Sequence, residues 1–193
     1  MIALAAAIVA TIGIIWYAYS QHNVQVNGAA VASSPGPNLP TPLPVGAKAP
    51  FFSVTARGVP ISSLTLGGKP FLLEIFATWC PHCQRMTTVL RDIRAKFPPS
   101  RFGMVSVTGS PYAMTSNADQ TIPESESDVE QFEQTYNVTW PSAFDQNLTL
   151  AKTWGLGGFP TIFIVDAHGK IVYVHSGEID ESVLVKAITS AGG

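Results

Sequence analysis

Two cysteines separated by two residues, Cys80 and Cys83, lie where one hydrophobic pattern gives way to another. The run Phe71–Phe76 before them is almost continuously apolar, which predicts a central strand covered on both faces. From Pro81 onward, apolar residues recur at helical spacing until Pro98, which predicts an amphipathic helix. The first cysteine is therefore expected at a helix N-terminus, where free N–H groups and the helix dipole stabilise a thiolate.

Such a pair could staple the chain, bind a metal or carry redox chemistry. A bridge between Cys80 and Cys83 closes a very short loop and would add little stabilising entropy. A tetrahedral zinc site needs four ligands, and neither His168 nor His175 has a spacing that indicates one. A CxxC pair directly after a strand is typical of redox motifs, so the two cysteines are the candidate catalytic residues. No metal site and no organic cofactor are expected.

The remaining patterns alternate between strands and helices. A hairpin, Phe51–Val54 with Val59–Ser62, is expected before the first central strand. Further strands are predicted at Phe102–Thr108, Thr161–Val165 and Ile171–His175, and further helices from a capping box of Ser127 and Glu130, around Leu148–Trp154 and over Asp180–Thr189. Gly109–Glu126 exceeds the usual connection length and is expected to shape a substrate surface or to move. This order predicts an α/β fold with a mixed central sheet and helices on both faces.

The N-terminal 45 residues differ in composition from the rest. The chain is 46% hydrophobic and only 12% charged, an unusual balance for a wholly soluble protein. The apolar run within residues 1–19 would form a helix of about 27 Å, close to the thickness of a bilayer core, and aromatic residues cluster at its end. Residues 20–45 are rich in Pro, Ser, Asn and Gly and predict a semi-rigid stalk. Residues 46–191 would form the folded domain.

The alternative for residues 1–19 is a cleaved signal peptide, although the run lacks a basic start and an evident cleavage site. Both interpretations place the folded domain outside the cytoplasm, in the periplasm or at the cell surface, and the first predicts attachment to the membrane. The formal net charge of -2 and the lack of charge runs argue against nucleic acid as a partner.

The segment from Phe76 to Cys83, FATWCPHC, resembles the active site of the thioredoxin superfamily. Gly46–Phe51 and Gly68–Pro70 resemble the entry of its membrane-anchored TlpA/ResA-like branch. Gly158–Thr161 is similar to the family's cis-proline loop. The resemblance covers residues 46–191 and implies a thioredoxin-like fold, preceded by the N-terminal hairpin and a transmembrane anchor. It also implies protein thiol or disulfide substrates and a membrane redox partner that recycles the cysteines.

Roles for the site follow from this resemblance. Cys80 would attack, Cys83 would resolve the mixed disulfide and form the redox disulfide with it, and a cis Pro160 would face them. Glu74 lies in an apolar strand, so burial would raise its pKa, and its position matches the buried acid that exchanges a proton with the second cysteine. His82 would add positive charge near the Cys80 thiolate. The expected substrate contacts are Trp79, Phe159, Pro160 and Thr161.

A departure from this branch leaves the direction of electron flow open. The branch usually has a hydrophobic or acidic residue and then proline between its cysteines, whereas Pro81-His82 is similar to the dipeptide of the strong oxidant DsbA. The protein could be a reductase, for example in cytochrome maturation, or an oxidase. A copper-handling module that uses both thiolates is the alternative from another class. A peroxidase is a further alternative, but Ala77 stands where the usual Thr-x-x-Cys arrangement has threonine.

Overall fold

The central sheet has five strands in the order β7-β4-β3-β8-β9. The structure is a computed structural model and describes residues 40–116 and 120–193. The strands are β3 (Phe71–Phe76), β4 (Gly103–Thr108), β7 (Ser142–Ala143), β8 (Thr161–Val165) and β9 (Ile171–Ser176). Strand β3 runs parallel to β4 and antiparallel to β8, so the sheet is mixed, as predicted.

Every residue of β3 is buried, so both faces of the strand are covered. This burial explains why the sequence of β3 is almost continuously apolar. Side chains alternate between the two faces of a strand. Leu72 and Phe76 belong to the core on one face, and Leu73 and Ile75 belong to the core on the other. Glu74 therefore shares its face with Leu72 and Phe76.

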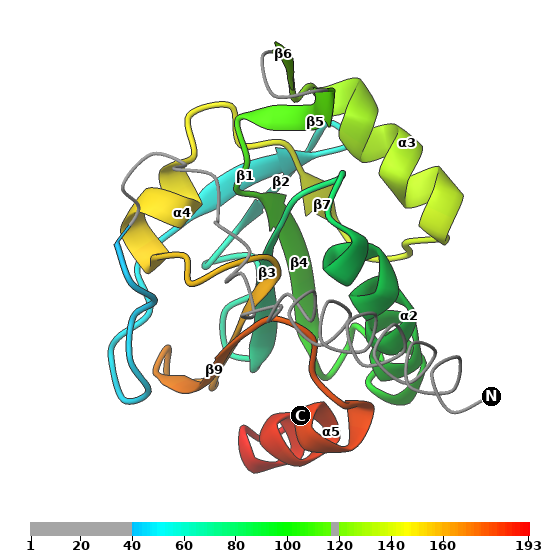
Figure 1. Ribbon diagram of the computed structural model, residues 1–193. Coiled ribbons are helices and arrows are strands. Elements are labelled where there is room, and N and C mark those ends of the chain that lie inside the picture. The colour runs from blue at the N-terminus through cyan, green and yellow to red at the C-terminus, as the bar shows by residue number, and fades with distance from the viewer. Residues whose placement is uncertain (1–39, 117–119) are drawn as a thin grey trace, which may run out of the picture. The chain divides into compact units, whose positions relative to one another are not determined.

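Helices cover both faces of the sheet, as Figure 1 shows. The first face is covered by α2 (Pro81–Lys96), α3 (Glu126–Tyr136) and α5 (Glu181–Ser190). The second is covered by α4 (Thr149–Trp154) and by the hairpin of β1 (Ser53–Ala56) and β2 (Val59–Ser62). The prediction of a thioredoxin-like α/β fold with a mixed sheet and helices is confirmed.

The start of α3 differs from the prediction. The N-cap is Ser125, and the reciprocal residue of the capping box is Asp128 rather than Glu130. The Ser125 N–H donates to the Asp128 carboxylate over 2.8 Å. Both Ser125 and Ser127 have an acidic residue three positions later, so the sequence offers two boxes, and the extended backbone of Ser125 selects the earlier one.

The predicted loop Gly109–Glu126 contains an antiparallel hairpin, β5 (Tyr112–Ser116) with β6 (Gln120–Pro123). Its polar composition gives no alternating pattern, so the pairing is not evident from the sequence. The edge strand β7 was also missed, because two residues are too short to carry a hydrophobic period.

Residues 40–45 belong to the same compact unit as the rest of the described chain. The Leu43 N–H donates to the carbonyl of Trp154, and the Leu156 N–H donates to the carbonyl of Pro40. The expected boundary at residue 46 therefore falls inside this unit. The predicted anchor at residues 1–19 lies outside the described residues. Within the described ranges, no helix combines the length and the apolar character needed to cross a membrane.

Candidate active site

Cys80 is the N-cap of α2, as its place before an amphipathic helix predicts. Strand β3 ends at Phe76, and the chain turns through Ala77, whose carbonyl accepts the Cys80 N–H over 3.1 Å. The Cys80 carbonyl accepts the first backbone hydrogen bond of the helix, from the N–H of Gln84. Pro81 occupies the first helical position, where its missing N–H costs no bond. The strand and the helix together place Cys80 at the positive end of the helix dipole.

The Cys80 thiol is activated by its surroundings. Its side chain is 5% exposed, and its Sγ lies 3.8 Å from the carbonyl oxygen of Phe159. Hydrogen bonding by the Cys83 side chain lowers the pKa of Cys80 from 9.0 to about 6, helped by the backbone N–H groups of Cys83 and His82 and by the charge of His82. A thiol with this pKa is mostly thiolate at pH 7.

The Cys83 thiol has the opposite character. It is fully buried, and burial raises its pKa well above 9.0, with further increases from the bond to Cys80 and from the charge of Glu74. Both cysteines are free thiols in this structure. One sulfur of the pair is thus prepared to attack, and the other remains protonated until a base takes its proton.

Glu74 lies on β3 in the face covered by α2 and is 3% exposed. Its Oε2 accepts a hydrogen bond of 2.5 Å from the hydroxyl of Ser106, the residue paired with it on β4. Its Oε1 has no hydrogen-bond partner among the residues that the structure describes. Burial raises the pKa of Glu74 to about 7 against the opposing effect of Ser106. The carboxyl can therefore gain or lose a proton near neutral pH.

The loop before β8 supplies the other wall of the site. The peptide bond between Phe159 and Pro160 is cis. The Thr161 hydroxyl donates to the carbonyl of Gly158 over 2.7 Å, which ties the loop to the buried start of β8. The Phe159 ring meets the Trp79 ring edge-on at 5.9 Å between centroids. Pro160 and Thr161 are both buried, so of the four expected substrate contacts the partly exposed ones are Trp79 and Phe159.

His82 is exposed and forms part of a cluster that the sequence does not indicate. Its Nδ1 lies 2.5 Å from Oε1 of Glu178, and Arg85 donates to the same oxygen over 2.6 Å. Arg85 and then His82 lower the pKa of Glu178 to about 2. Glu178 follows β9 and is 96 residues away from His82 in the chain, so no local pattern connects the two.

Sequence reasoning also missed two residues beside the active-site turn. The carboxyl of Glu124 accepts hydrogen bonds from Thr78, and the hydroxyl of Ser110 accepts one from the Trp79 indole. Both lie at the ends of the segment that was predicted as a loop. A buried glutamate beside a proline and a serine carries no periodic signal, which explains the omission.

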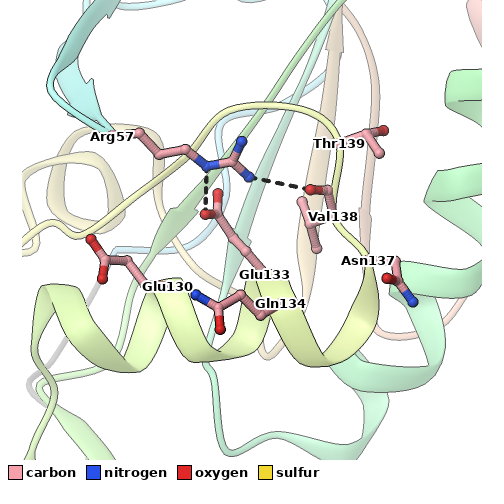
Figure 2. A pocket seen from close by; sticks show the side chains of 7 residues that line it. All are labelled: Arg57, Glu130, Glu133, Gln134, Asn137, Val138 and Thr139. Carbon is pink, nitrogen blue, oxygen red and sulfur yellow. Dashed lines mark hydrogen bonds and ion pairs between the residues drawn. The ribbon is translucent and has the colours of Figure 1, made fainter.

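A polar pocket of about 660 Å³ lies at the C-terminal end of α3 (Figure 2). Arg57 spans it, donating 2.7 Å to the Glu133 carboxylate and 3.2 Å to the carbonyl of Val138. None of its lining residues is a predicted site residue. In the described part of the chain, no three His, Cys, Asp or Glu side chains gather in a way that could hold a metal ion, and the copper-handling alternative gains no support.

Known proteins resemble this chain over its folded part. The family model named Redoxin matches residues 44–188. The chain is 32% identical over 153 residues to the thiol:disulfide interchange protein DsbE of Allochromatium vinosum, covering 78% of this chain and 76% of that protein. It is 28% identical over 135 residues to the thiol-disulfide oxidoreductase ResA of Bacillus thuringiensis, covering 69% and 70%.

Solved structures show the same fold. A thiol:disulfide interchange protein from Chlorobium tepidum superposes with a TM-score of 0.62 at 24% identity, covering 78% of this chain and 99% of that one. The family match spans most of the chain and includes the strand, both cysteines and the cis-proline loop. The resemblance to the thioredoxin superfamily and its TlpA/ResA-like branch is confirmed, and the chain is an oxidoreductase. The chain therefore belongs to the Redoxin family.

Proposed function

We propose that this oxidoreductase exchanges disulfides with protein substrates through Cys80 and that Cys83 resolves the mixed disulfide. The observation that carries the proposal is the asymmetry between two neighbouring thiols. The pKa of Cys80 is lowered to about 6, and the pKa of Cys83 is raised well above 9.0. Only a deprotonated sulfur attacks a disulfide, so the first step belongs to Cys80.

In the reductive direction, the Cys80 thiolate attacks one sulfur of a substrate disulfide. A bond forms between Cys80 and that sulfur, and the other substrate sulfur leaves as a thiolate. Cys83 then gives up its proton and attacks the Cys80 sulfur, which forms the Cys80–Cys83 disulfide and releases the second substrate thiolate. The substrate disulfide is reduced by two electrons, and the dithiol is oxidised by two.

Glu74 is the proposed acceptor of the Cys83 proton. Its carboxyl influences the pKa of Cys83 through its charge, and its own pKa of about 7 leaves it partly ionised at neutral pH. A base with a pKa near the working pH is best matched to this transfer. Trp79 and Phe159, which meet edge to face beside Cys80, are the proposed apolar contacts of the substrate.

We assign the reductive direction to this protein. A thiolate that is strongly stabilised makes the reduced form stable and the protein oxidising, as in DsbA with a pKa of about 3.5. The pKa of about 6 for Cys80 is nearer to the value of about 7 for thioredoxin. The likeness to the TlpA/ResA-like branch favours the same direction.

The proposal includes a place in the cell. Residues 1–19 would anchor the protein in a membrane, and the Pro-rich segment after them would hold the domain on the extracytoplasmic side. A membrane redox partner would then return electrons to the Cys80–Cys83 disulfide. The apolar run in the sequence and the likeness to the membrane-anchored branch support this placement.

Trapping of the mixed disulfide tests the proposed function. In Cys83→Ser the Cys80 adduct cannot be resolved, so non-reducing gels should show adducts with an oxidised protein substrate, and peptide mapping should place them on Cys80. Cys80→Ser is the control and should trap none. Wild-type protein equilibrated with glutathione should have a reduction potential below about −200 mV. Adducts on Cys83 would contradict the assigned roles, and a potential near −120 mV would contradict the direction.

A further inference from the structure

The segment between β4 and α3 contacts the active-site turn at both of its ends. Ser110 lies shortly after β4, and Glu124 lies just before the N-cap of α3. Their partners, Thr78 and Trp79, are consecutive residues and directly precede Cys80. The hairpin between Ser110 and Glu124 thus leaves from the active-site turn and returns to it.

The contact of Glu124 with Thr78 is a double one. Oε1 accepts 2.7 Å from the Thr78 hydroxyl and 3.3 Å from the Thr78 N–H. Glu124 is 6% exposed, and its Oε2 has no hydrogen-bond partner in the described part of the chain. Burying a carboxyl with one oxygen unpaired costs free energy. An apolar residue would fill the same space without that cost but would lose the bonds to Thr78 and the interaction with Thr108 at the end of β4.

Ser110 holds the next residue of the turn. Its hydroxyl accepts 3.1 Å from the Trp79 indole, accepts 3.1 Å from the Tyr112 N–H and donates 2.9 Å to the Tyr112 carbonyl. Two bonds to the backbone of Tyr112, the first residue of the hairpin, therefore fix the hydroxyl that accepts the indole N–H. Trp79 is in turn packed edge-on against Phe159, so its position defines the surface beside Cys80.

We propose that Glu124 and Ser110 are positioning residues for disulfide exchange, which together hold the turn that sets the Cys80 sulfur at the end of α2 and the Trp79 ring beside it. The inference rests on the proposed function. Among the described residues, the bonds from Glu124 and Ser110 to the turn go to Thr78 and Trp79 and not to the sulfurs, so each acts through its neighbour in the turn. The sulfur must keep its bonds to Cys83 and to the helix N–H groups to remain a thiolate. Small displacements of reacting groups can cost about 100-fold in rate.

The test compares deletion of each bond with a substitution that keeps it. Glu124→Leu removes the acceptor and Thr78→Val removes the hydroxyl, whereas Glu124→Gln keeps a carbonyl acceptor and Thr78→Ser keeps the hydroxyl. The two deletions should lower kcat/KM for a disulfide substrate by about 10-fold or more and move the Cys80 titration at 240 nm to higher pH. The two conservative variants should stay within about threefold of wild type. Adding Thr78→Val to Glu124→Leu should change little, since Glu124→Leu already removes both bonds to Thr78 and Thr78→Val removes one of the same two.

Two further variants separate positioning from stability. Ser110→Ala frees the indole and should raise KM for a protein substrate by about 10-fold with little change in kcat. Glu133→Leu is the matched control, because Glu133 is also a buried glutamate with one unpaired oxygen in the described chain, but it pairs with Arg57 away from the cysteines. It should lower the unfolding temperature and leave the Cys80 titration unchanged.

The outcomes distinguish the positioning role of Glu124 and Ser110 from the proposed function. Wild-type rates and titrations in Thr78→Val would overturn the role of Glu124 even if Glu124→Leu does not fold, and an unchanged KM in Ser110→Ala would overturn the role of Ser110. An equal titration shift in Glu133→Leu would assign the effect to general loosening and overturn the proposal. If wild type and Cys80→Ser are equally inactive, the proposed function fails, whereas the Cys80 titration still tests the positioning role of Glu124 without a substrate.

Discussion

Replacing Glu74 by glutamine should stabilise the fold at neutral and alkaline pH. Burial raises the pKa of this carboxyl from 4.5 to about 7, so the folded chain keeps a proton that the unfolded chain gives up. Between these two values the free energy of unfolding falls as the pH rises, because the folded state binds more protons. Below pH 4.5 both states are protonated, and the penalty disappears. Glutamine does not titrate and avoids the penalty at every pH.

The size of the effect follows from the pKa. Each pKa unit corresponds to about 1.36 kcal/mol, so the rise to about 7 costs the wild type about 3 kcal/mol above pH 7. The glutamine amide in turn places an N–H₂ group where Oε1 has no partner among the described residues. That change costs about 1–3 kcal/mol, but it is the same at every pH. The diagnostic quantity is therefore the change with pH of the difference in free energy of unfolding between Glu74→Gln and its parent.

The assay is urea unfolding of both proteins at several pH values from 4 to 8. A Cys80→Ser/Cys83→Ser background removes the titrating thiols, and burial, the largest cause of the shift, remains. The stability of Glu74→Gln relative to its parent should increase by about 3 kcal/mol across this range. Glu130→Gln, at an exposed position of α3, is the control. A difference for Glu74→Gln that stays constant within about 0.5 kcal/mol would refute the reasoning.

Two further predictions concern the edge of the site and the N-terminal region. His82→Ala should raise the pKa of Cys80, because it removes the His82 charge that lowers this pKa and keeps only the backbone N–H. Glu178→Gln should lower the pKa of Cys80, because it removes the ion-pair partner that offsets the His82 charge. Titrations at 240 nm that superimpose would show that the cluster has no influence on the thiolate. Deletion of residues 1–39 should give a soluble, active domain, whereas deletion of 1–45 should also lower its unfolding temperature by removing backbone bonds to α4 and the residues that follow it. A 1–39 deletion that sediments with membranes would contradict the anchor.

Local patterns were sufficient to predict the centre of the site. Strand, cysteine pair and helix are contiguous in the chain, and each has a pattern that depends only on its neighbours: continuous apolar residues, a proline at the first helical position, and helical spacing. The same locality explains why the burial of Glu74 could be predicted from the apolar residues on both sides of it. The structure places it 3% exposed.

The contacts between distant segments could not be predicted. Glu178 reaches His82 from the loop after β9, and Glu124 reaches Thr78 across 46 residues. Each is a single polar side chain whose partner is determined by how the helices and the sheet pack, and hydrophobic periodicity carries no information about such pairs. The hairpin that ends beside Glu124 could not be predicted either, because backbone pairing holds it together and leaves no hydrophobic period in the sequence.

The central claim is that the fold activates one sulfur of the pair and suppresses the other. The most direct measurement is the alkylation rate of each cysteine as a function of pH, with the reduced wild-type protein, iodoacetamide and peptide mapping. Cys80 should react with a midpoint near pH 6, and Cys83 should remain unmodified below pH 9 while the protein is folded. A midpoint for Cys80 near its ordinary value of 9.0, or modification of Cys83 first, would contradict the account.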